Sequence, residues 1–183
     1  MGNYMNHLKP VRLRDLRTQA AFILKDLAAP SSRCIIAAKK IQQLPLYADK
    51  SLDWITTHGK EIKLKYAYAA LAIDYGFKNW DEFKHSVAEK DCLYCPAAVG
   101  FIYAWFADYD AAEAYHAKHG GCLLSFWADI IVCGDEYVRE TGLQRHEVQW
   151  KKIGYNWVRP ADPGSFQILK NAAINTYLKK NEG

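Results

Sequence analysis

The sequence has no long apolar run, because charged or polar residues interrupt every hydrophobic stretch. A membrane-spanning helix needs about 20 consecutive, mostly apolar residues, so we expect no such helix and no membrane partner. The opening segment MGNYMNHLKPVRLRD also lacks the apolar core of a secretory signal. We therefore expect a cytoplasmic location, where the five cysteines remain free thiols.

Several catalytic motifs are absent as well. The sequence contains no phosphate-binding loop, no Gly-x-Gly-x-x-Gly fingerprint, no nucleophile elbow and no His-Glu-x-x-His helix. Their absence removes the nucleotide-binding, esterase and zinc-protease classes that such motifs identify. An enzyme of another kind is still open at this point.

The net positive charge of the chain comes from its first half. Residues 1–90 contain 15 Lys and Arg against 9 Asp and Glu, a net charge of +6, whereas residues 91–183 contain 9 against 11, a net charge of −2. A basic half favours an anionic partner, either nucleic acid or an acidic protein surface. Arg14, Arg17, Lys39 and Lys40 are the candidate contacts.

Apolar residues at spacings of three and four predict helices throughout the first half. The expected helices span residues 11–28, 32–44, 51–58 and 64–75, with Gly76 ending the last of them and Asn79 capping another. The helix at 64–75 is apolar on most of its sides, which indicates a central position. Its expected inner face is Leu64, Ala67, Tyr68, Leu71, Ala72 and Tyr75, with Phe77 folding back on Leu71 and Ala72.

The segment from Leu64 to Lys84 follows the pattern L-K-x-A, an apolar run, then G-F-x-x-W-x-x-[LF]-K. The match depends on eight residues, which are Leu64, Lys65, Ala67, Gly76, Phe77, Trp80, Phe83 and Lys84. This pattern resembles a short helical element of uncharacterised bacterial proteins. The resemblance implies helix packing and brings no activity with it.

The second half mixes strands and helices. Residues 100–106, CLLSFW and DIIVC are short apolar runs that predict three strands, the last two as a hairpin. A helix capped by Asp108 or Asp110 is expected to end at Gly120 and Gly121, and a final helix at 165–179. The fold class is therefore α+β and mostly helical. A basic helical region at 1–88 is expected to pack against an α+β region with a small sheet at 89–183, as one compact unit.

The cysteines offer one candidate metal site. The spacing Cys92-x2-Cys95-x23-His119-x2-Cys122 could supply three thiolates and one imidazole to a tetrahedral zinc, with Cys133 as a substitute for His119. However, each residue also has a separate explanation as a buried thiol, a turn residue or a helix-terminal histidine. We therefore expect no cofactor and treat structural zinc as the alternative.

The same region offers the candidate catalytic residues. Cys122 could act as a nucleophile with His116 or His119 as base, and Asp129 lies close by in sequence. The acids at Asp135 and Glu136 stand where a helix start favours negative charge, which explains them without catalysis.

Three functions remain from the sequence. The first is a non-catalytic binding or accessory protein that meets an anionic partner through its basic half. The second is a small enzyme with a site near His116, His119, Cys122 and Asp129. The third is a homo-oligomeric or protein-interaction module that uses the six Trp and twelve Tyr residues as contact surface.

Overall fold

The computed structural model describes residues 9–181, and the chain divides into two compact units, Met1–Val87 and Ala88–Gly183. Residues 1–8, on which the expectation of no secretory signal partly depends, lie outside the described residues. In residues 9–181, no helix is both long and apolar enough to cross a membrane. The fold is α+β and mostly helical, with a small antiparallel sheet in the C-terminal half.

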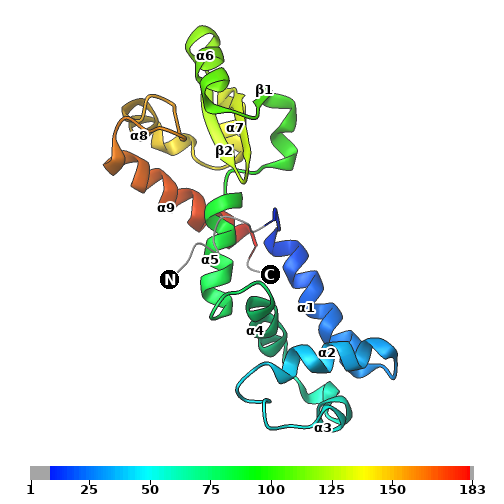
Figure 1. The fold of residues 1–183 in the computed structure, drawn as a ribbon. Coiled ribbons are helices and arrows are strands. Elements are labelled where there is room, and N and C mark those ends of the chain that lie inside the picture. The colour runs from blue at the N-terminus through cyan, green and yellow to red at the C-terminus, as the bar shows by residue number, and fades with distance from the viewer. Residues whose placement is uncertain (1–8, 182–183) are drawn as a thin grey trace. The chain divides into compact units, whose positions relative to one another are not determined.

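The first unit is built from helices, which Figure 1 shows in blue to green. They are α1 (Leu13–Ala28), α2 (Ser32–Gln42), α3 (Leu52–Thr57), the 3₁₀ turn η2 (Gly59–Glu61), α4 (Leu64–Asp74) and α5 (Trp80–Asp91), whose last turn belongs to the second unit. Helix α1 packs against both α2 and α4. Its buried residues Leu13, Leu16, Ala20, Ile23 and Leu27 follow the predicted spacing of three and four.

Helix α4 ends as the sequence predicts. Gly76 has φ +81°, its N–H donates to the Ile73 carbonyl at 2.9 Å, and the N–H of Phe77 donates to the Ala72 carbonyl at 2.8 Å. These two bonds form a Schellman motif, which satisfies carbonyls that have no partner within the helix.

The apolar contact of this motif differs from the expectation. The Phe77 ring stacks on Phe83 at 4.7 Å, and Tyr75 stacks on the same ring at 4.8 Å. Trp80 meets Phe83 edge-on at 5.9 Å. The aromatic residues of the G-F-x-x-W-x-x-F pattern therefore form one cluster around buried Phe83.

The expected inner face of α4 is confirmed in its middle and wrong at its start. Ala67, Leu71 and Ala72 are buried, whereas Leu64 is 42% exposed because it opens the helix. Asn79 caps the next helix as predicted, and Glu82 makes a second contact at the same helix start. Asn79 Oδ1 accepts from the N–H of Glu82 at 2.9 Å, and the Glu82 carboxylate accepts from the N–H of Lys78 at 3.3 Å.

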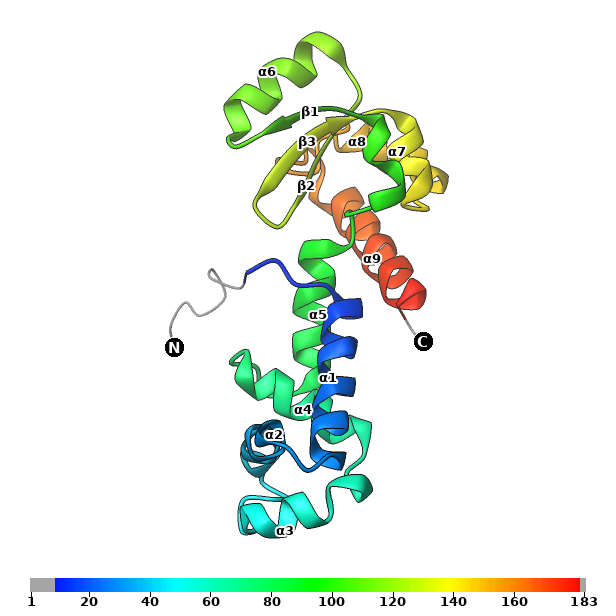
Figure 2. The same cartoon turned by 90° about the vertical axis from the view of Figure 1, so that its right-hand side faces the viewer.

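The second unit carries the sheet. Its elements are the 3₁₀ turn η3 (Pro96–Phe101), β1 (Ile102–Phe106), α6 (Tyr109–His119), β2 (Cys122–Phe126), β3 (Asp129–Cys133), α7 (Asp135–Glu140), the 3₁₀ turn η4 (Gln144–His146), α8 (Glu147–Lys152) and α9 (Pro163–Lys180). The strand order is β1-β3-β2, and β3 is antiparallel to both neighbours. Strands β1 and β2 therefore run parallel, with α6 connecting them across one face of the sheet (Figure 2).

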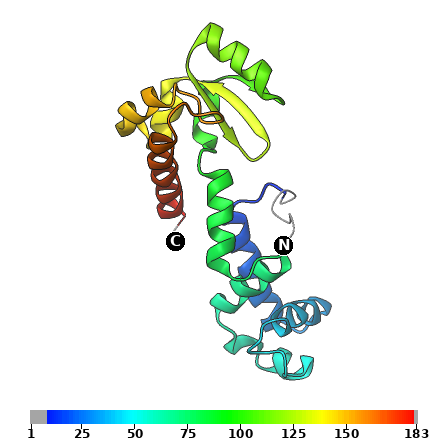
Figure 3. The ribbon, with the colours of Figure 1, turned by 60° about the vertical axis from the view of Figure 1, so that its left-hand side comes forward.

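The predicted β2–β3 hairpin forms although it lacks an Asn-Gly turn. Its two-residue turn is Trp127 and Ala128, and Trp127 adopts the left-handed conformation with φ +54°. Figure 3 shows this hairpin in yellow-green. The turn is held at the end of α5, because the Trp127 N–H donates to the Lys90 carbonyl at 3.0 Å and its Nε1 donates to Asp91 at 2.7 Å. The hydroxyl of Tyr177 donates to the other oxygen of Asp91 at 2.6 Å.

Candidate functional site

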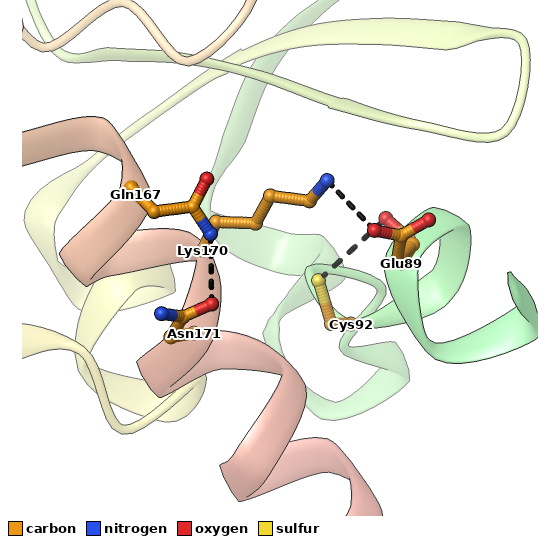
Figure 4. A network of polar contacts seen from close by, with 5 residues as sticks. All are labelled: Glu89, Cys92, Gln167, Lys170 and Asn171. Atoms are coloured by element: carbon orange, nitrogen blue, oxygen red, sulfur yellow. Dashed lines mark hydrogen bonds and ion pairs between the residues drawn. The ribbon is translucent and has the colours of Figure 1, made fainter. Parts of the chain in front are cut away.

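The four residues of the candidate zinc site make separate contacts. Cys92 is buried at the end of α5, and its thiol donates to the Glu89 carbonyl at 3.9 Å. The Glu89 carboxylate pairs with Lys170 of α9 at 2.8 Å, in a network that also contains the Gln167–Asn171 hydrogen bond (Figure 4). Burial raises the pKa of Cys92 to about 12, which keeps the thiol protonated at neutral pH.

The backbone that follows Cys92 forms hydrogen bonds with the hydroxyl of a buried tyrosine, Tyr137. The N–H of Cys95 donates to the hydroxyl of Tyr137 at 3.1 Å, and that hydroxyl donates to the Leu93 carbonyl at 2.8 Å. Tyr137 is only 1% exposed, so these two bonds satisfy a polar group inside the core. The segment KDCLYCP therefore packs around Tyr137 as a structural turn.

The other two candidate zinc ligands, His119 and Cys122, also make separate contacts. His119 is exposed on α6 and stacks on the Tyr115 ring at 4.3 Å. Cys122 is buried opposite Cys133 in the hairpin, where the Cys133 thiol donates to the Cys122 carbonyl at 3.5 Å. Among residues 9–181, no group of three or more His, Cys, Asp or Glu side chains is arranged to hold a metal ion.

The proposed catalytic residues do not converge either. Burial raises the pKa of Cys122 to about 12, so its thiolate is scarce at neutral pH. His116 uses Nε2 in a 3.0 Å hydrogen bond with the Gly121 carbonyl. Asp129 opens β3 while Cys122 opens the antiparallel β2, so the two residues stand at opposite ends of the hairpin.

A cavity of about 360 Å³ opens beside Cys122. It is lined by Cys122, Asp135, Val138, Arg139, Gln144, Glu147, Trp150 and Tyr155. These residues come from the start of β2, from α7, from η4 and α8, and from the segment after α8. The volume lies within the range of small-molecule sites.

A second cavity, of about 500 Å³, shares two of these residues. It is lined by His116, Ala117, Gly120, Gly121, Asp135 and Tyr155. We call the two cavities together the β2–α7 cleft. His116 and Cys122, which the sequence singled out, therefore both border this cleft, whereas His119 and Asp129 do not line it.

Gly121, which follows the end of α6, allows the cleft wall to approach β3. A Cβ atom on Gly121 would lie 2.5 Å from the Cys133 carbonyl oxygen, and the residue has φ +89°. Only glycine avoids both the contact and the backbone strain. The ring of Tyr103 lies against the same region, 3.3 Å from that Cβ position.

Tyr155, which lines both cavities, has a strained backbone. Its φ is +54°, a conformation that costs a non-glycine residue about 1–3 kcal/mol. The conformation is fixed by backbone bonds to the edge of β2, where the Leu123 N–H donates to the Tyr155 carbonyl at 2.9 Å and the Trp157 N–H donates to the Leu123 carbonyl at 2.8 Å. Strained residues of this kind gather at binding and active sites.

Sequence reasoning missed most of the cleft. Asp135 was assigned only to a helix start, and Arg139, Glu147 and Tyr155 were not singled out. One local signal is present, since Gly154 ends α8 with a Schellman motif and leads directly into Tyr155. Residue spacing does not predict that β2, α7 and α8 meet around one cavity.

The candidate anion contacts lie on two helices of the first unit. Arg14, Arg17 and Lys39 make no ion pair within residues 9–181, whereas Lys40 of α2 pairs with Asp74 of α4. Arg14 and Lys39 are exposed and Arg17 is half-buried. Lys40 therefore already has a structural role, and three of the four cations have their charge available.

Four of the six exposed large apolar side chains described in the second unit lie along β1 and the turn before it. These four are Val99, Phe101, Tyr103 and Trp105, each at least 40% exposed, whereas Val148 and Ile168 lie on α8 and α9. β1 is also an edge strand of the sheet. These features agree with the third function expected from the sequence, a protein-interaction surface, but they identify no partner.

Comparisons with protein-family models, with curated proteins and with solved structures find no match to this chain. The site must therefore be interpreted from its own geometry.

Proposed function

We propose that the chain is a non-catalytic binding protein that holds a small molecule in the β2–α7 cleft. The strained backbone of Tyr155 carries this proposal, because its conformation places the phenol at the junction of two cavities of about 360 and 500 Å³. Backbone hydrogen bonds to β2 on both sides of Asn156 fix that conformation, and a site held by the protein's own backbone is pre-organised for binding.

Two features support binding over catalysis. The raised pKa of Cys122 leaves the only thiol that lines the cleft protonated. The Nε2 of His116 is hydrogen-bonded to the Gly121 carbonyl, and among residues 9–181 no hydrogen bond joins the His116 ring to the Cys122 thiol. A Cys-His pair needs these two groups in contact.

Amide chemical shifts of the full-length chain test this proposal. A library of small polar compounds, added one at a time, is expected to contain members that shift the amide signals of Gly121, Asp135 and Tyr155. Tyr155→Ala should weaken such binding at least tenfold. Trp105→Ala is the matched control, because Trp105 is an exposed aromatic residue of the same unit that does not line the cleft. A library that leaves all these signals unmoved contradicts the proposal.

A second function is favoured by a separate observation, the three cations without an ion pair in the described part of the first unit. Arg14, Arg17 and Lys39 would contact a nucleic acid backbone or another anionic partner. Affinity for a DNA or RNA oligonucleotide should then fall steeply with salt, and alanine at these positions should flatten the slope.

Lys40 provides the control for this second function. Because its ammonium is paired with Asp74, Lys40→Ala should change the salt slope less than Lys39→Ala. Binding that is undetectable at low salt, or a slope that none of the substitutions changes, removes nucleic acid as a partner.

A further inference from the structure

The 360 Å³ cavity of the β2–α7 cleft presents both signs of charge. Asp135 and Arg139 are four residues apart on α7, so their side chains project from the same face of the helix. Glu147 of α8 also lines this cavity. A ligand in it meets a carboxylate and a guanidinium at the same time.

These two opposite charges do not neutralise each other. Within the described part of the chain, neither Asp135 nor Arg139 forms an ion pair, although their spacing would allow one. Glu147 pairs instead with Lys151 at 2.7 Å, and this hydrogen bond lowers the pKa of Glu147. Asp135 and Arg139 are therefore the charges left for a ligand.

Asp135 and Cys122 line the same cavity. After burial, the negative charge of Asp135 is the second cause that raises the pKa of this thiol. A positive group of a ligand would find its partner there.

The floor itself is apolar. Cys122, Val138 and Trp150 line the cavity and are 2%, 6% and 3% exposed. Their buried surfaces suit an aliphatic or aromatic group. The phenol of Tyr155 and the amide of Gln144 add hydrogen-bonding groups at the wall.

We propose that this cavity binds a free α-amino acid with an apolar side chain. Arg139 holds the carboxylate, Asp135 holds the ammonium group, and the side chain rests on Val138 and Trp150. The inference rests on the proposed function, since it names the ligand class of the same cleft. A simple amine would leave Arg139 without a partner, and a simple carboxylic acid would face Asp135 and Glu147 unfavourably.

Calorimetric titration of the full-length chain tests the inference with three related compounds. L-Leucine carries both charges, L-leucinamide lacks the carboxylate, and N-acetyl-L-leucine lacks the ammonium group. L-Leucine should bind, and each derivative should bind at least tenfold more weakly because one charged hydrogen bond is lost. Equal binding of leucine and both derivatives overturns the inference.

Two substitutions should show reciprocal effects. Arg139→Gln should weaken leucine at least tenfold without weakening leucinamide, while Asp135→Asn should weaken leucine without weakening N-acetyl-leucine. Arg145→Gln and Glu140→Gln are the matched controls, because both residues are exposed neighbours that do not line the cleft. Circular dichroism checks that every variant is folded.

The outcomes separate the inference from the proposed function. If leucine and L-phenylalanine both fail to bind while other small polar compounds shift the Tyr155 amide, the amino-acid inference is wrong and the binding function stands. If no compound of any kind shifts the cleft signals, both are wrong. Binding of leucine that Arg139→Gln and Asp135→Asn leave unchanged also contradicts the inference, because the ligand is then held elsewhere.

Discussion

At the scale of single residues, two consecutive glycines show how position decides their role. Gly120 and Gly121 both have positive φ, of +71° and +89°, and both follow α6. A Cβ atom on Gly120 would meet nothing within 4 Å, whereas one on Gly121 would lie 2.5 Å from the Cys133 carbonyl. The strain of a left-handed backbone is common to both, and the steric contact belongs to Gly121 alone.

We therefore expect different costs for the two alanine substitutions. Gly120 has φ +71° and ψ −157°, a conformation that is largely restricted to glycine, so Gly120→Ala should lower the free energy of unfolding by about 1–3 kcal/mol through backbone strain. Gly121→Ala should lower it by about 1–3 kcal/mol more, because β3 must move away from the added methyl group. Urea denaturation measures both. Equal losses of stability for the two variants would show that β3 moves away from the added methyl group at no cost in free energy.

The buried thiol of Cys122 predicts a pH dependence of stability. Its pKa is raised from an ordinary 9.0 to about 12 in the folded chain. Between these values the folded state keeps a proton that the unfolded state has lost. The contribution of this thiol is therefore intact below pH 9 and is lost as the pH rises from 9 towards 12.

Cys122→Ala removes this contribution. The free energy of unfolding of the variant should decline less steeply above pH 9 than that of the native chain. Chemical denaturation at several pH values between 7 and 10.5 gives both slopes. Identical slopes would mean that the Cys122 thiol ionises as readily in the folded chain as in the unfolded one.

At the scale of elements, residue spacing predicted most helices and strands to within a few positions. The stripe of α1, the glycine ends of α4 and α6, and the β2–β3 hairpin all form. The errors concern what each side chain touches. The contact of Phe77 with Phe83 depends on how α4 and α5 pack, which the period of a single helix does not contain.

Helix α4 provides a stability test with an internal control. Leu71 is 3% exposed and belongs to the core that α1, α2 and α4 share, so Leu71→Ala should cost about 2–5 kcal/mol. Leu64, on the same helix, is 42% exposed, so Leu64→Ala should change stability by no more than about 0.5 kcal/mol. Thermal or urea unfolding measures the difference. Similar costs for the two substitutions would contradict the assigned orientation of α4.

At the scale of the whole molecule, the cleft could not be predicted from the sequence. Its lining residues are spread from His116 to Tyr155, and they meet because β2, α7, α8 and the segment after α8 pack in the second unit. Conversely, a plausible spacing does not bring the candidate zinc ligands together within residues 9–181. Cys92 and Cys122 stand in a plausible spacing, but the Cys92 thiol donates to the Glu89 carbonyl, whereas Cys122 lies opposite Cys133 in the hairpin.

This separation predicts how the chain responds to a chelator. Incubation with EDTA should leave the melting temperature unchanged, and elemental analysis should find no stoichiometric zinc. A structural zinc contributes directly to folding, so its removal would lower the melting temperature markedly. A chelator-dependent shift that added zinc reverses would restore the Cys92, Cys95, His119 and Cys122 site.

The strand order has a consequence for how the chain is made. β3 occupies the middle of the sheet although it is the last of the three strands in the chain. When the ribosome reaches Asp129, β1 and β2 have already been translated without the strand that joins them. Because domains fold as units once their parts are available, the nascent sheet must wait for Cys133 to leave the exit tunnel. During that interval neither β1 nor β2 has the strand with which it pairs in the folded sheet.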